Sequence, residues 1–173
     1  RVVDFESKGC RFESCWACFF LPILFFLSKQ EVSIMALEKI YQELILKHYR
    51  SPHHFGTLPV FNAFAELENI NCGDLISLQI KKQDNIIQDI HFTGEGCSLS
   101  IASASIMCNL VHGKNINIVQ EMTKTILKIF QGELPESLLE KYGETIVFQE
   151  LISYKNRMAC VSLPWQVLSS IIS

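Results

Sequence analysis

A segment of alternating polarity, joined by a short polar turn to a second strand candidate, constrains the fold of this chain most strongly. Residues 75–81 place their apolar side chains on one face of an expected strand: Ile76, Leu78 and Ile80. The polar turn 82–85 leads into residues 86–93, which we expect to form a second strand. A connection this short favours antiparallel pairing. A weaker candidate at residues 61–68 comes first, so the sequence predicts a three-stranded antiparallel meander.

Segments with helical periodicity lie on both sides of the expected sheet. Residues 35–50 predict an N-terminal amphipathic helix that ends at Ser51-Pro52. The helices expected after the sheet cover residues 98–111, 115–130, 135–141 and 158–168. Gly143 would break the third of these, and Pro164 would lie near the first turn of the last. Because strands and helices are segregated, the predicted class is α+β, a small three-stranded antiparallel sheet packed against helices, with an N-terminal helix and a C-terminal helix.

Composition limits the classes of protein to which the chain can belong. It has 173 residues, the size of one domain, and its hydrophobic content of 49% is enough for a core. The formal net charge of −3 gives no basic surface for nucleic acid. Seven cysteines, an odd number at irregular spacing, do not match a secreted disulfide framework. We therefore expect a cytoplasmic protein whose cysteines are buried, metal-bound or reactive.

The first 34 residues differ from the rest. Their apolar core, residues 15–27, is too short to span a membrane and is preceded by acidic residues, unlike a signal peptide: Asp4, Glu6 and Glu13. Met35 opens the first clean amphipathic helix. We interpret residues 1–34 as non-native upstream translation, with a leader as the alternative, and residues 35–173 as the functional domain, with no membrane segment.

Three cysteine segments raise the question of a shared site. Cys72 and Asp74 flank Gly73 in a tight loop, so both can turn toward one ion. Cys97 opens the small-residue helix at 98–111, whose N-terminus stabilises negative charge. Cys160 follows Arg157 by three residues, and that guanidinium can steady a thiolate or bind an anion.

The chemistry of this residue set leaves several readings open. Three cysteines and an aspartate suit a tetrahedral zinc site, and thiolates also suit an iron–sulfur cluster. The spacings are long and unlike the paired CxxC of a zinc ribbon, so buried structural cysteines are a third reading. Cys108, in the middle of an apolar helical segment, illustrates that reading, and we assign it to the core. His53 and His54 also suggest a metal, but we interpret them as solvated loop residues.

At these residues the sequence resembles a known family. The segments "NCGD", "GEGCSLSIASASIM" and "RMACVSLPW", with the opening "IYQELILKHYRSPHHFG", resemble the IscU/NifU-type iron–sulfur cluster assembly scaffold family. The resemblance runs from about Leu37 to Leu168. Ala159 stands where the IscU branch has a histidine, whereas Arg157 and the segment 163–165 fit the SufU branch. The inserted segment 133–156 is more loosely matched.

The resemblance implies a SufE/NifU-like fold and a site. Its zinc ligands would be Cys72, Asp74, Cys97 and Cys160, with Cys72 accepting sulfur and Arg157 assisting it. The implied function is a sulfurtransferase-like, zinc-dependent acceptor and carrier of persulfide sulfur from a SufS-type cysteine desulfurase, working with other cluster assembly proteins. The alternative is a scaffold that binds iron and assembles a [2Fe–2S] cluster on the same cysteines. Ile70 replaces a proline usual in the family, which removes rigidity from the loop but no ligand.

Overall fold

The sheet has the predicted meander. In the computed structural model, which describes residues 38–172, the strands are β1 (Ala63–Asn69), β2 (Asp74–Gln83) and β3 (Ile86–Glu95). They pair antiparallel in the order β1-β2-β3. The apolar face of β2 pairs with inward residues of both neighbours, as in Ala65↔Leu78 and Ile80↔Ile90. The predicted α+β class is confirmed.

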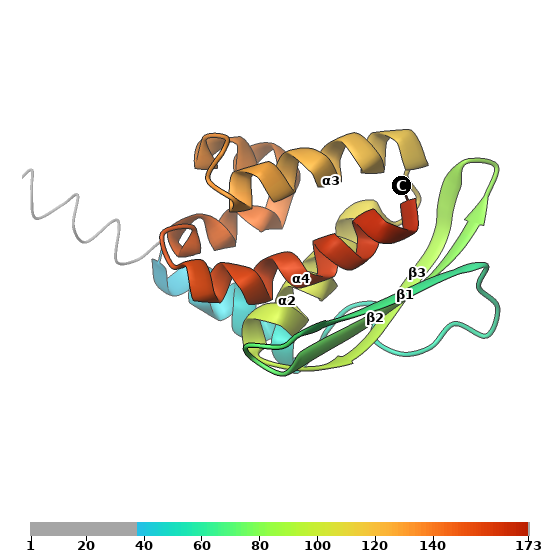
Figure 1. Ribbon diagram of the computed structural model, residues 1–173, viewed down its shortest axis with the longest axis horizontal. Coiled ribbons are helices and arrows are strands. Elements are labelled where there is room, and N and C mark those ends of the chain that lie inside the picture. The colour runs from blue at the N-terminus through green and yellow to red at the C-terminus, as the bar shows by residue number, and fades with distance from the viewer. Residues whose placement is uncertain (1–37, 173) are drawn as a thin grey trace, which may run out of the picture. The chain divides into compact units, whose positions relative to one another are not determined.

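The helices gather on one side of this sheet (Figure 1). After the sheet come α2 (Ser98–Val111), α3 (Ile116–Phe130), the 3₁₀ segment η1 (Glu136–Leu151) and α4 (Lys155–Ile172). A first helix covers residues 38–50 and buries Ile45 and His48. The start predicted at Met35 and the assignments made for residues 1–34 lie outside the described residues.

Helix α2 is the centre of the domain. Its residues from Ser100 to Cys108 are all buried, and most of them are small. Small side chains let α4 approach closely. As a result, Ser103 Oγ on α2 donates to the Val161 carbonyl on α4 at 2.6 Å. The buried Trp165 indole donates in turn to Ser103 Oγ at 3.1 Å. The buried polar atoms of this interface are therefore hydrogen-bonded to one another.

Two details of the helical half differ from the sequence prediction. Helix α4 begins at Lys155, so Pro164 lies in its interior and not near its first turn. Proline there removes the amide hydrogen bond to the Cys160 carbonyl, but burial of most of the helix outweighs that loss. The 3₁₀ segment resumes after the break at Tyr142 and Gly143, whereas the sequence predicted only a short helix before it.

The free edge of β3 is covered by the loop that follows the first helix. The Phe92 amide donates to the His54 carbonyl, and the Gly56 amide donates to the Phe92 carbonyl, both at 2.9 Å. Phe55 and Phe92 thus form a parallel bridge, with their rings edge to face. This bridge fixes where the loop crosses the edge of the sheet.

Candidate metal centre

Cys72 lies at the tip of the β1–β2 connection. The amides of Cys72 and Gly73 donate to the Asn69 carbonyl at 3.1 and 2.8 Å, and Gly73 has a φ of 70°. A side chain would strain that left-handed conformation, so glycine suits the turn. The Cys72 thiol is exposed. The turn therefore presents a sulfur atom both to the domain and to solvent.

Asp74 joins this turn to helix α2. It is the first residue of β2 and only 2% of it is exposed. Its Oδ1 accepts the Cys97 amide at 2.9 Å, and its Oδ2 accepts the Cys97 thiol at 3.5 Å. Cys97 is the N-cap residue of α2, so the carboxylate also lies at the positive end of the helix. One side chain thus fixes the position of a second predicted ligand.

Cys160 completes the group from the buried face of α4. Its Sγ lies 3.3 Å from Cys72 Sγ, and the residue is 4% exposed. Burial raises the pKa of the Cys160 thiol, and hydrogen bonds with Asp74 and Cys72 raise it further. Cys72, Asp74 and Cys160 place one ligand atom each within 4.8 Å of one another. Three of the four predicted ligands therefore lie together, and the fourth, Cys97, reaches the group through its contact with Asp74.

The donor set fits a tetrahedral metal ion. Ligand atoms around zinc lie roughly 3.5–3.8 Å apart when the bonds to sulfur and oxygen have their usual lengths. The Cys72–Cys160 and Asp74–Cys97 separations of 3.3 and 3.5 Å are close to that range. A cation would also compensate the negative charge that deprotonated thiols would place beside a buried carboxylate. Iron suits the same thiolates.

Three further residues support this centre and were not identified from the sequence. The side-chain amide nitrogen of Asn69 lies 3.8 Å from Cys160 Sγ, and Ser100 Oγ lies 3.7 Å from Cys97 Sγ. Gly96 is needed for space, because an added Cβ would lie 2.8 Å from Asp74 Oδ1. The glycine directly before Cys97 is the sequence signal that could have indicated this close packing.

Arg157 lies one helical turn before Cys160 on α4 and is exposed. Its guanidinium carbon is 5.2 Å from the centroid of the Tyr154 ring, a cation–π arrangement. Its position on the same helix face agrees with a role near the thiols. The assistance it gives to Cys72 stays a prediction.

Cys108 behaves as the sequence analysis expected. It is completely buried in α2, and burial strongly raises the pKa of its thiol. A neutral thiol in an apolar environment is a poor nucleophile and a poor metal ligand. It therefore provides an internal comparison for the three cysteines of the centre.

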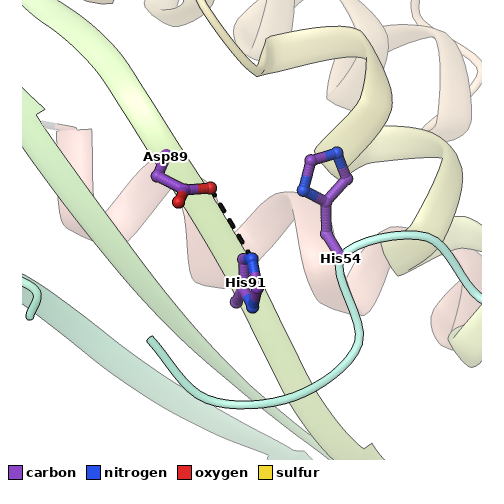
Figure 2. A group of neighbouring side chains, drawn as sticks. All are labelled: His54, Asp89 and His91. Carbon is purple, nitrogen blue, oxygen red and sulfur yellow. Dashed lines mark ion pairs between the residues drawn. The ribbon is translucent and has the colours of Figure 1, made fainter. Parts of the chain in front are cut away.

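The interpretation of both loop histidines as solvated is wrong for one of them. His53 is exposed, but His54 is half-buried and lies with Asp89 and His91 (Figure 2). Pairing of the loop with β3 brings His54 there, and nothing local in the sequence reveals that pairing. His48, in the predicted N-terminal helix, was not identified from the sequence as a functional residue. It is buried, with Nδ1 2.8 Å from Ser105 Oγ and Nε2 3.1 Å from Glu144 Oε2.

Comparison with known proteins agrees with this arrangement. Residues 40–161 match the model of the NifU-like N terminal domain. The chain belongs to this family.

Individual relatives carry two different names. The chain is 33% identical over 132 residues to the zinc-dependent sulfurtransferase SufU of Bacillus subtilis, covering 76% of this chain and 88% of that one. It is 30% identical to the iron–sulfur cluster assembly scaffold protein IscU of Streptococcus pyogenes, covering 82% and 87%. A crystal structure described as a putative iron–sulfur cluster assembly scaffold protein for the SUF system of Fervidobacterium islandicum superposes with a TM-score of 0.69. That protein is 28% identical, and the match covers 76% of this chain and 95% of that one.

Among residues 38–172, no helix combines the length and the apolar character needed to cross a membrane.

Proposed function

We propose that this protein serves iron–sulfur cluster assembly as an acceptor and carrier of persulfide sulfur. The observation that carries the proposal is the convergence of Cys72, Asp74, Cys97 and Cys160 from three separate parts of the chain. Similarity to a zinc-dependent sulfurtransferase over most of both chains supports it.

These four residues would hold the zinc ion. Bound zinc would keep the cysteine sulfurs deprotonated near neutral pH. Within the chain, Asp74 positions Cys97 through its backbone amide, and Asn69 places its side-chain amide beside Cys160. Two of the four ligands are thus oriented by neighbouring hydrogen bonds, as outer contacts orient ligands in many metal sites.

Cys72 is the residue proposed to receive sulfur. Its thiolate attacks the outer sulfur of a persulfide on the donor protein, so a new S–S bond forms on Cys72 while the donor's S–S bond breaks. The outer sulfur keeps its proton, and the donor cysteine leaves as a thiolate. This step balances without an external oxidant and follows the logic of thiol–disulfide exchange. Cys160 is a weaker candidate because it is buried.

The donor is proposed to be a SufS-type cysteine desulfurase, with other cluster assembly proteins acting downstream. Exposed apolar side chains beside the accepting loop would contact such a partner: Ile70 is 90% exposed and lies two residues from Cys72. Arg157, one turn before Cys160, would steady the negative charge on the attacking sulfur. The cytoplasmic location inferred from the cysteine content stays a prediction.

A second candidate function is a scaffold for a [2Fe–2S] cluster, which would be the cargo of the protein. The three converging thiols favour it, as does similarity to a scaffold protein. Ala159, which supplies no ligand beside Cys160, favours sulfur transfer instead.

Incubation of the full chain with a SufS-type desulfurase and cysteine distinguishes the sulfur-carrier function from the scaffold function. We expect faster alanine formation and one added sulfur atom on the Cys72 peptide by mass spectrometry. Cys72→Ser should abolish the adduct, and Cys108→Ala, which leaves the centre intact, should keep it. An adduct that persists in Cys72→Ser, or no adduct in any form, would contradict the proposal. Stoichiometric iron and acid-labile sulfide in protein purified without oxygen would establish the scaffold function.

A further inference from the structure

A second group of metal-ligand residues lies outside the cysteine centre. His54, Asp89 and His91 each place one ligand atom within 4.8 Å of the others. Figure 2 shows Asp89 and His91 on β3 and His54 on the loop beside that strand. His112, just after α2, adds a fourth group, because its Nε2 lies 3.9 Å from Asp89 Oδ1.

The backbone holds these side chains in place. Asp89 and His91 are two residues apart on β3, so they project from the same face of the sheet. His54 is fixed beside them because its carbonyl accepts the Phe92 amide at 2.9 Å. The ligands therefore come from paired backbone segments, a more rigid support than a free loop.

The separations fit metal ligands better than hydrogen bonds. His91 Nε2 lies 3.6 Å from Asp89 Oδ1, and His112 Nε2 lies 3.9 Å from the same oxygen. Both distances exceed the range of about 2.7–3.2 Å for a hydrogen bond. Ligand atoms around a metal bound by nitrogen and oxygen lie roughly 3.0–3.5 Å apart, so small side-chain rotations would suffice.

The polar atoms of the group also have capacity for a ligand. His91 Nδ1 is buried and has no hydrogen-bond partner among the described residues. Asp89 Oδ1 accepts the Ile90 amide at 3.0 Å, which leaves lone pairs on the carboxylate. Ion pairing alone explains the group poorly, because the rings of His91 and His112 lie 5.8 and 5.1 Å from that of His54. Three imidazolium ions so close would repel one another, whereas neutral imidazoles can share one cation.

We propose that His54, Asp89 and His91, with His112 beside them, bind a divalent first-row transition-metal ion. Imidazole and carboxylate ligands suit zinc, cobalt, nickel and ferrous iron, and no thiolate takes part. Such an ion ties the loop after the first helix to β3 and to the end of α2. It therefore stabilises the edge of the sheet.

This site is separate from the cysteine centre. Cys97 precedes α2 and His112 follows it, 15 positions later in the sequence. At about 1.5 Å per helical residue, the two ends lie roughly 22 Å apart. The proposal does not depend on the function proposed for the cysteines.

Cobalt(II) titration of the full chain, with its cysteine centre already loaded with zinc, tests the proposal. We expect one further cobalt ion per chain, visible d–d absorption without a sulfur-to-cobalt charge-transfer band, and a higher Tm. His91→Ala and Asp89→Asn should each weaken binding by at least about tenfold, since losing a direct ligand costs more than losing a residue that only hydrogen-bonds to a ligand. His53 is the exposed neighbour of His54, so His53→Ala is the matched control and should bind cobalt as the wild type does.

The site would be disproved by three outcomes. These are no cobalt binding beyond the cysteine centre, binding that carries a thiolate charge-transfer band, or equal affinity in wild type and both ligand variants. Circular dichroism of each variant establishes that it is folded. Because Asp89→Asn is nearly isosteric, it keeps the test decisive even where His91→Ala does not fold.

Discussion

The two ends of helix α2 carry residue clusters of opposite chemical character. At its N-terminus, Cys97 contacts the buried carboxylate of Asp74, which lies beside the paired thiols of Cys72 and Cys160. Beyond its C-terminus, His112 approaches a group of imidazoles and one half-buried carboxylate. Soft sulfur ligands suit zinc and iron–sulfur chemistry, whereas nitrogen and oxygen ligands suit an ion that holds structure together. One rigid helix can thus support two sites with different tasks.

The largest effect is expected from a reciprocal pair of variants. Asp74→Asn removes a ligand charge but keeps an acceptor for the Cys97 amide, so metal affinity at the cysteines should fall by more than about tenfold. Asp89→Asn should leave that affinity unchanged and weaken only the histidine group. Zinc titration with a competing chelator measures both. If either variant affected both clusters equally, the two could not be independent sites.

Gly96→Ala should damage the cysteine end alone. The new Cβ would lie 2.8 Å from Asp74 Oδ1 and 2.6 Å from Ser100 Oγ, so the carboxylate must move. We expect a loss of about 1–3 kcal/mol in the free energy of unfolding, together with weaker metal binding. Urea denaturation and metal titration provide the two measurements.

Gly132→Ala is the matched control for that variant. Gly132 has a φ of 78° but no other atom within 4 Å of an added Cβ, so only backbone strain should result. It should cost about 1 kcal/mol and leave metal binding unchanged. Normal metal affinity in Gly96→Ala would show that the position of Asp74 is not set by this glycine.

Acid should weaken the fold through a histidine outside both clusters. Burial lowers the pKa of His48 from 6.5, outweighing the opposite effect of Glu144. The unfolded chain therefore binds more protons below that pH, and stability present above about pH 6.5 is lost as the pH falls. Urea denaturation with a chelator present should show a lower unfolding free energy at pH 5.5 than at pH 7.5.

His48→Gln should reduce this pH dependence but not remove it. Burial and the nearby His112 and His91 also lower the pKa of His54, which contributes in the same direction. If the unfolding free energy of His48→Gln changed with pH as steeply as that of the wild type, groups other than His48 would cause the acid sensitivity.

The smallest structural effect is expected from Arg157→Ala. Its exposed cation–π contact with Tyr154 should contribute at most about 1 kcal/mol, and metal content should not change. The rate of sulfur transfer to Cys72 should nevertheless fall, with partial recovery in Arg157→Lys, which keeps the charge. Equal rates of sulfur transfer in the wild type, Arg157→Ala and Arg157→Lys would show that Arg157 does not assist the transfer.

The difference between the clusters also explains what the sequence could reveal. Strands β2 and β3 and helix α2 were predicted closely because the sequence signals for these elements are local. The cysteine ligands were identified by resemblance to family motifs, since their spacings alone were weak. The histidine group was missed because its members are 35 or more positions from His54. Only the pairing of His54 with the edge of β3 brings them together.

Packing likewise explains the errors in the helical half. Pro164 suggested a helix start because a proline inside a helix is unfavourable in isolation. Its helix is nevertheless continuous because Leu163, Trp165 and Leu168 are buried in the core. In β1, Ala63 and Ala65 face inward while Phe64 is 54% exposed, which explains why this strand was the weaker candidate in the sequence.

X-ray absorption on the metal-loaded full chain tests the central claim most directly. The account predicts zinc bound mainly by sulfur in the wild type, with sulfur-bound metal lost in both Cys72→Ala and Asp74→Ala. Zinc without sulfur ligands, or sulfur-bound zinc at full occupancy in both variants, would contradict a metal centre built from Cys72, Asp74, Cys97 and Cys160.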